Sequence, residues 1–380
     1  MPSSLDYRER SILGLTASDR SVAAMVLVIK ATVLLFGALS FQVTNDERVR
    51  TLTRLLSIWN RWDGPQYLLI AQDGYASTGD QRLALAFFPL YPWLIRLTEI
   101  VVRDAVLSAF LISTVASVAA GVALARLLAI DYSRHLARRA VWFMFIFPTS
   151  YFLHIDYSES LFLALVLASF MAARRERWLQ AGIFGAFAAL ARPNGFLLLP
   201  ALGADALWEL WQTHRFNWRW LWVGLIPMGL AVYLLVNYRI TGDPIAFLSV
   251  QREHWAHTLV APWSSIGVNF EVARDWDPSQ AAMIGTQVLF YLVVGLAGAI
   301  AAAFLLRPSY AVWMALNWLF LSTQSWDISA PRYTLMMFPL FILFARLARQ
   351  RIWDAAIIAW SLLWLGFFVS EFVGGRHWAF

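Results

Sequence analysis

Long apolar runs constrain the fold of this chain more than any other feature. Apolar residues make up 60% of the 380 residues and charged residues only 14%, whereas soluble globular domains have about 45–50% and about 25%. One transmembrane helix needs about 20 mostly apolar residues. The chain therefore has room for many spans, and we expect one integrated all-α domain over residues 1–380 that crosses a membrane repeatedly.

Hydropathy predicts a polytopic helical bundle of about eleven spans. The runs lie near residues 21–43, 104–129, 137–155, 159–173, 178–191, 195–212, 219–239, 281–306, 308–323, 333–348 and 352–373. The first run is too long for the apolar part of a signal peptide, so we expect it to be a retained span. Leu83–Val102 is long enough to cross, but Pro89 and Pro92 interrupt it and leave its path open.

Arginines between the apolar runs orient the chain. If Leu83–Val102 crosses, the cluster around Arg134 lands outside. If it lies at the interface or re-enters, that cluster and those around Arg174 and Arg346 all fall on the cytoplasmic side, as the positive-inside rule expects. The second arrangement makes 44–103 and 240–280 external loops. It also places these charged residues on the external face: Asp63, Asp73, Asp156, Glu159, Arg192, Asp243, Glu253, Asp327 and Arg332.

The composition excludes several classes of function. The net charge is +6, but the basic residues form short clusters between spans, so they indicate topology rather than a nucleic-acid surface. The chain has no cysteine, which excludes disulfides, thiolate metal sites and a cysteine nucleophile. We expect membrane lipids, and no nucleic acid, as partners.

A polar loop follows the first apolar run and contains Asp63. Trp62 precedes this acid and Gly64-Pro65 follow it. These neighbours hold the carboxylate at a turn beside the membrane, where burial can shift its pKa toward the value that a general base needs. The flanking segments 59–75 and 84–97 are rich in aromatics and proline. Those aromatics are equally typical of a segment that lies in the membrane interface.

Two further groups of polar residues carry potential chemistry. In the turn from His154 to Glu159, two acids and a histidine could hold a metal or share a proton, but helix capping by Asp156 or Ser158 is the stronger interpretation. A divalent ion, Mg²⁺ or Mn²⁺, stays open, and no cofactor is assigned. An arginine at bilayer depth usually has an anionic partner, and a phosphate would suit Arg192 and Arg332. For Arg332, snorkelling to the interface is an equal alternative.

Two stretches of the first polar loop, residues 61–75 and Ala86–Pro92, are followed along the chain by three weaker motifs: Tyr157–Phe162, Arg192–Gly195, and Gly242–Pro244 with Gln251 and Trp255. In these stretches and in their order the chain resembles the PIG-V family of mannosyltransferases, which add the second mannose to glycosylphosphatidylinositol. Residues 61–75 and Ala86–Pro92 resemble the first external loop of that family. The resemblance implies a GT-C-like bundle whose long first external loop carries interfacial helices. It also implies that Asp63 is the catalytic carboxylate.

The resemblance leads to a hypothesis of inverting sugar transfer, with mannose the favoured sugar. A polyprenyl-phosphate sugar would donate to a lipid or glycan acceptor on the external face, with Asp63 as general base. The expected donor- and acceptor-binding residues are Trp62, Gln66, Tyr67, Asp156, Glu159, Arg192, Asn194, Gln251, Trp255, Arg332 and Tyr333. Members that act on glycosylphosphatidylinositol have a Tyr-Glu-His-like approach where this chain has Arg82–Leu85, so the acceptor need not be that lipid.

A transporter or flippase of a lipid-linked sugar is the main alternative. Transporters tend to show inverted repeats and charges near the middle of their spans, whereas Lys30 is the clear mid-span charge here. A membrane acyltransferase would centre on a histidine inside a span, and the six histidines lie at loops and ends. The short loops favour a bacterial cytoplasmic membrane, with the site facing outside, over the endoplasmic reticulum with a lumenal site.

Overall fold

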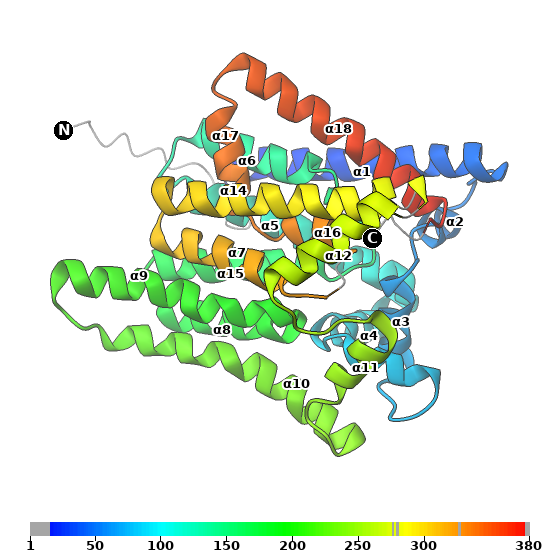
Figure 1. The fold of residues 1–380 in the computed structure, drawn as a ribbon, viewed down its shortest axis with the longest axis horizontal. Coiled ribbons are helices and arrows are strands. Elements are labelled where there is room, and N and C mark those ends of the chain that lie inside the picture. The colour runs from blue at the N-terminus through cyan, green and yellow to red at the C-terminus, as the bar shows by residue number, and fades with distance from the viewer. Residues whose placement is uncertain (1–15, 276, 279–280, 326–327, 377–380) are drawn as a thin grey trace.

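The computed structural model describes residues 16–275, 277–278, 281–325 and 328–376, so Asp327 lies outside the described residues. These residues are mostly helical, and their one β-type pairing is an isolated bridge between Leu259 and Gln324. The expectation of an all-α bundle is therefore confirmed. In Figure 1 most long helices run along the same axis, and a group of short helices covers one end.

Among the residues that the structure describes, five helical segments are long and apolar enough to cross a membrane, which makes this an integral membrane protein. They are Ala17–Asn45 (α1), Ala105–Leu128 (α5), Trp218–Thr241 (η4 with α10), Met283–Leu305 (most of η5 with α14) and Arg351–Val373 (α18). Their outward faces carry large exposed apolar side chains such as Val28, Phe304 and Leu363. Such faces belong against lipid rather than water.

The other apolar runs form helices of 16 residues or fewer. They are α6 (Arg134–Ile146), α7 (Glu159–Arg174), α8 (Trp178–Ala191), α9 (Leu198–Thr213), α15 (Pro308–Ser322) and α17 (Pro339–Leu347). At about 1.5 Å per residue, a helix of 13 residues such as α6 reaches about 20 Å, less than the apolar thickness of a bilayer. The number of spans therefore stays a prediction.

The break after α6 shapes the middle of the bundle. Phe147 takes an extended conformation, as expected before Pro148, and a short 3₁₀ turn, η2 (Ser150–Leu153), follows. Every residue from Phe147 to Ser160 is buried. Irregular backbone is tolerated at membrane depth where protein surrounds it, so this segment forms part of the core.

The segment Leu83–Val102, whose path the sequence left open, contains no helix long enough to cross. It is divided between η1 (Asp80–Ala86) and α4 (Leu90–Val102), and Pro89 marks the start of α4. One face of α4 is buried against α5, and Leu97, Ile100 and Val101 are exposed on the other. A short amphipathic helix of this kind suits the membrane interface, as the second arrangement of the topology requires.

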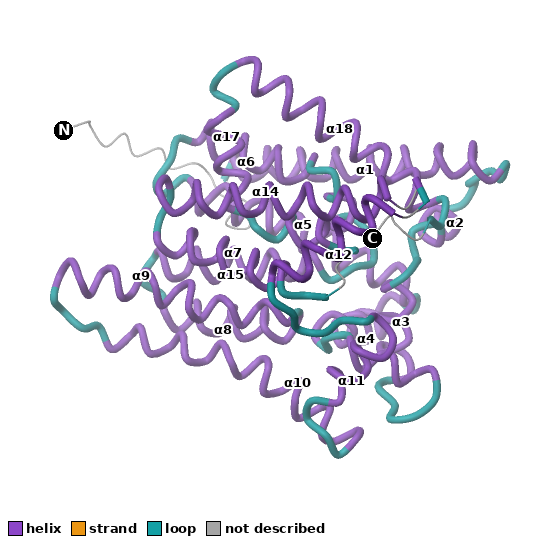
Figure 2. The backbone as a smooth tube through the Cα atoms, in the orientation of Figure 1, coloured by secondary structure: helices purple, strands orange, loops and turns teal. Residues whose placement is uncertain are grey.

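The loop segments gather at one end of the bundle. The first loop contributes α2 (Leu52–Ser57), α3 (Asp63–Asp73), η1 and α4, and the later loop contributes α11 (Ala246–Trp255) and α12 (Pro262–Asp275). Figure 2 shows the connecting loops among α3, α4 and α11 at that end. Two short helices between the long ones, η3 (Pro193–Leu197) and α16 (Ala330–Thr334), complete this end of the bundle. Segments distant in sequence therefore meet there.

The contact between α8 and α10 allows a test of the packing. A methyl group at Gly229 would lie 1.9 Å from the carbonyl oxygen of Ala186, whereas one at Gly203 in α9 meets nothing within 4 Å. We expect Gly229→Ala to destabilise the protein by about 1–3 kcal/mol, because backbone would have to move, and Gly203→Ala to leave it unchanged or slightly stabilised. Thermal unfolding in detergent measures both, and equal midpoints would contradict the close approach.

Candidate active site

Asp63 is the first residue of α3 and follows a strained turn. Trp62 has φ of 54° and ψ of −102°, a backbone conformation that residues other than glycine rarely adopt. The Tyr157 hydroxyl holds this turn in place: it donates to the Arg61 carbonyl at 2.7 Å and accepts from the Asp63 backbone N–H at 3.2 Å. Strain maintained by a surrounding structure is typical of functional sites.

Four charged side chains form a continuous chain that begins at Asp63. Arg332 donates to Asp63 at 2.6 Å through one guanidinium nitrogen and to Glu159 through another. Glu159 also accepts from Arg192. Positive and negative charges alternate, so the four groups are neutral together, as a buried cluster requires. Glu159 is fully buried, whereas the Asp63 side chain is 25% exposed.

Aromatic rings and a serine hold the two arginines. The Arg332 guanidinium lies 4.7 Å from the ring centres of both Phe152 and Tyr157, and that of Arg192 lies 5.2 Å from the Tyr333 ring. Arg192 also donates to the Ser158 hydroxyl at 3.1 Å. Cation–π contacts and charged hydrogen bonds of this kind fix a guanidinium plane. Both cations are therefore positioned before any ligand binds.

A pocket opens beside this chain of charges at the loop end of the bundle. Seven of the residues expected to act at the site line it: Asp63, Tyr67, Arg192, Gln251, Trp255, Arg332 and Tyr333. The pocket brings together α3, α11, α16 and the turn between α8 and η3. It therefore joins a carboxylate, two arginines and an aromatic wall.

The other five expected residues lie outside the pocket lining. Glu159 and Asp156 are buried behind it, and Asn194 donates to the Asn317 side chain at 2.9 Å, which connects η3 to α15. Trp62 is 38% exposed and Gln66 partly buried on the first loop. These positions suit roles in holding the site rather than contacting a ligand.

Several residues at the site had weak or no signals in the sequence. Phe87 and Phe88 line the pocket and belong to the aromatic segment already singled out. His257 and Ser329 also line it, although nothing about their sequence surroundings distinguished them. Ser158 connects Tyr67, 2.9 Å away, to Arg192. The capping hypothesis for this turn is wrong for Ser158, because its side chain makes no cap bond to α7.

A second group of polar residues lies behind α3. Lys30 of α1 donates to the His154 carbonyl at 2.6 Å. The Asp156 carboxylate has no hydrogen-bond partner among the described residues, and it lies so close to α3 that a methyl group at Gly64 would be 2.9 Å from its Oδ2. Burial raises the pKa of Asp156 to about 8, although the Lys30 charge opposes this. Asp156 is thus mainly a neutral acid near pH 7.

The donor set for a metal ion is sparse. In the parts of the chain that the structure describes, histidine, aspartate and glutamate side chains form no group of three that could hold an ion. Asp63 and Glu159 are each bound to arginine instead. The described residues therefore do not fit a divalent ion held by protein ligands.

The buried Asp156 should make stability depend on pH. Its pKa is higher in the folded protein than its ordinary value of 3.8, so the folded state binds a proton that the unfolded state releases, and stability falls as the pH rises from about 4 to about 8. From about pH 4 to about pH 8 we expect the thermal unfolding midpoint of the wild type to fall by about 5 °C or more beyond any fall in Asp156→Asn, because the variant has no carboxyl group to titrate at this position. The exposed Asp73→Asn is the control, and parallel profiles for the wild type and Asp156→Asn would contradict the assignment.

Comparison with known proteins places the chain in a family. Residues 24–212, about half of the chain, match the family described as mannosyltransferase (PIG-V). No curated protein sequence matches. Among solved structures, ArnT from Cupriavidus metallidurans, bound to undecaprenyl phosphate, is similar with a TM-score of 0.56 at 15% identity. The match covers 90% of this chain and 63% of ArnT.

An oligosaccharyltransferase from Archaeoglobus fulgidus, tethered to an acceptor peptide, is similar with a TM-score of 0.46 at 13% identity, over 94% of this chain and 55% of that one. The likeness to ArnT confirms the expectation of a GT-C-like helical bundle. On the match over residues 24–212, which contains Asp63, Glu159 and Arg192, this chain belongs to the PIG-V mannosyltransferase family.

Proposed function

We propose that this protein transfers a sugar, most simply mannose, from a polyprenyl-phosphate donor to a hydroxyl of a lipid or glycan acceptor on the external face of its membrane. The observation that carries the proposal is the ion pair between Asp63 and Arg332 at the pocket wall. It places a carboxylate that can accept a proton next to a cation that can hold a phosphate.

The donor phosphate is proposed to bind Arg192 and Arg332. Both guanidinium groups line the pocket and are otherwise buried, and Arg192 Nε has no hydrogen-bond partner among the described residues. An unpaired buried donor is unfavourable and favours an acceptor such as a phosphate oxygen. ArnT, which shares this fold, was crystallised with undecaprenyl phosphate, and that supports a lipid phosphate here.

The proposed reaction is a single displacement at the anomeric carbon. The acceptor oxygen forms the new bond to that carbon as its proton passes to Asp63, and the bond from carbon to the phosphate oxygen breaks with its electron pair left on the phosphate. The configuration inverts because the two oxygens occupy opposite sides. Arg192 and Arg332 stabilise the charge that the departing phosphate gains.

Binding of the phosphate would also change the partner of Asp63. In the structure Arg332 pairs with Asp63 at 2.6 Å. A phosphate that binds Arg332 competes with this carboxylate for the same donors. The base would then be released toward the acceptor when the donor is in place, which ties proton acceptance to a loaded site and disfavours loss of the sugar to water.

The aromatic part of the pocket lining is proposed to bind the sugar and acceptor. Trp255 packs edge-on against Phe87 with ring centres 6.0 Å apart, and Gln251 lies one turn earlier on α11. Flat aromatic faces and amide groups suit the apolar and hydroxyl surfaces of a sugar. A salt bridge of 3.1 Å between Arg82 and Glu253 holds α11 against η1, so the first loop supports this wall.

Replacement of the proposed base tests the chemistry. We expect Asp63→Asn to lower transfer of mannose from polyprenyl-phosphate mannose by about 10²–10⁴-fold, because the acceptor proton has no base to receive it. Asp73→Asn removes an exposed acid from the other end of the same helix and should keep wild-type transfer. Transfer is measured with purified protein and candidate lipid acceptors. A folded Asp63→Asn protein with wild-type transfer would refute the assignment.

Replacement of Arg332 tests the phosphate site separately. We expect Arg332→Lys, which retains the charge but not the guanidinium fork, to lower turnover and to weaken binding of polyprenyl phosphate itself. Arg332→Gln should lose about 10²–10³-fold in turnover. Thermal unfolding shows whether either variant folds, since Glu159 loses a partner. Arg96→Gln, an exposed arginine of α4, is the control, and an equal effect of this control would contradict a specific phosphate site.

A further inference from the structure

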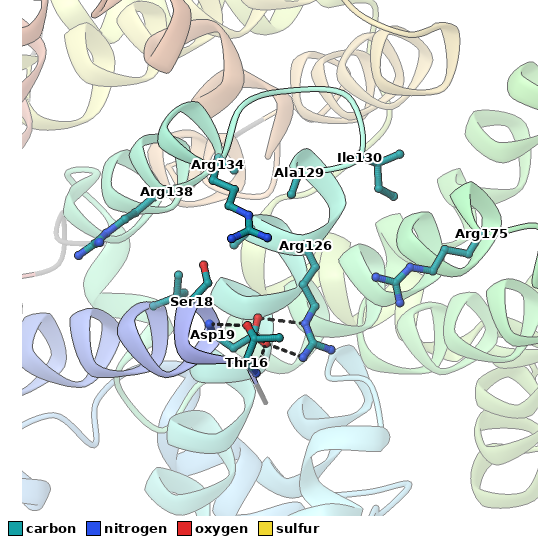
Figure 3. Close-up of a pocket in the computed structure, with 12 residues that line it drawn as sticks. Thr16, Ser18, Asp19, Arg126, Ala129, Ile130, Arg134, Arg138 and Arg175 are labelled. Atoms are coloured by element: carbon teal, nitrogen blue, oxygen red, sulfur yellow. Dashed lines mark hydrogen bonds and ion pairs between the residues drawn. The ribbon is translucent and has the colours of Figure 1, made fainter. Parts of the chain in front are cut away.

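A second basic cavity lies at the opposite end of the bundle from the candidate site. It has a volume of about 420 Å³ and is lined by Arg126, Arg134, Arg138 and Arg175 with Asp19 as the one acid. In Figure 3 Arg126 lies beside the Asp19 carboxylate, Arg134 and Arg175 are directed toward Arg126 from different elements, and Arg138 is directed away from it. The proposed reaction uses none of these residues.

The helix ends place this cavity far from Asp63. α7 begins at Glu159 in the candidate site and ends at Arg174, next to the cavity residue Arg175. Its 16 residues separate the two ends by about 24 Å. α6 runs the other way, with Arg134 at the cavity and Ile146 toward the site. The cavity therefore faces the side that the positive-inside rule assigns to the cytoplasm.

The charges that line the cavity are only partly balanced. Asp19 accepts two hydrogen bonds from Arg126, at 3.0 and 2.7 Å, and is buried. That pair neutralises one arginine. Arg138 and Arg175 form no ion pair with any residue that the structure describes, and both are exposed. Like charges that gather at one cavity repel one another and favour a bound anion.

The shape and depth of the cavity indicate the class of that anion. Its remaining lining combines Thr16 and Ser18 with apolar residues such as Val22 of α1 and Ile130 after α5, and both helices are long enough to cross a membrane. The cavity thus lies at the ends of two spans, where they meet the head-group layer, and it combines arginines with apolar surface. Basic pockets between helices at this depth bind phospholipid head groups, and the guanidinium fork matches phosphate oxygens.

We propose that this cavity binds a phosphate-bearing anion on the cytoplasmic face, held by Arg134 and Arg175, which are directed toward the same space beside Arg126. The site differs from the proposed donor site in position and in its arginines. Its occupant would strengthen the contact between α1, α6 and the end of α7, because it links residues from separate helices.

Binding to the full-length protein in detergent tests this proposal. One arm titrates short-chain phosphatidylglycerol, with phosphatidylcholine of the same chain length as the neutral comparison, and a second arm titrates inorganic phosphate. Native mass spectrometry counts the bound molecules. We expect Arg134→Gln/Arg175→Gln to weaken phosphatidylglycerol binding by about 10-fold or more.

A matched control removes the same charge from the same face. Arg215 follows α9 and Arg351 begins α18, and both are exposed and outside the cavity, so Arg215→Gln/Arg351→Gln should bind like the wild type. If inorganic phosphate binds and the cavity variant loses it, the anion is a free phosphate. If only the phospholipid binds in this way, it is a lipid head group. Equal loss in both double variants, or equal binding of the two lipids, would overturn the proposal.

Discussion

The Glu159 carboxylate, shared by Arg192 and Arg332, is the interaction on which the site depends. A single buried carboxylate is strongly destabilising without cations beside it. The two arginines come from positions 33 and 173 residues away. Their pairing therefore requires the start of α7, the turn after α8 and the short helix α16 to meet at one point. Arg332 then extends the chain of charges to Asp63.

The interruption of the bundle after α6 makes that meeting possible. A continuous helix through Pro148 would carry residues 147–158 past the site, and proline would also remove one of its hydrogen bonds. The buried irregular segment instead supplies Phe152 and Tyr157 beneath Arg332. Tyr157 also holds the turn at Trp62, so one residue supports both the cation and the backbone that carries the carboxylate.

The two ends of the bundle differ in how their charges are balanced. At the site, acids and arginines alternate, and a phosphate would have to replace an existing pair. At the opposite end, Asp19 pairs with Arg126, and Arg138 and Arg175 have no ion-pair partner among the described residues. The first arrangement suits a ligand that binds and leaves during a reaction. A phosphate replaces a carboxylate on the arginine, and this exchange limits the net free energy of binding. The second suits a resident anion.

The sequence by itself determined the class of the fold and the identity of the main charged residues. Apolar runs of about 20 residues require helices in lipid, and an arginine or acid between such runs is unfavourable unless it has a partner, so Asp63, Glu159, Arg192 and Arg332 were identifiable one by one. Only the tertiary structure decided how they pair, that Leu83–Val102 forms no spanning helix, and that Asp156 is buried apart from the pocket. Which acid pairs with which arginine depends on where the short helices end in space. Hydropathy measures only the preference of each segment for lipid, so it does not predict these pairs.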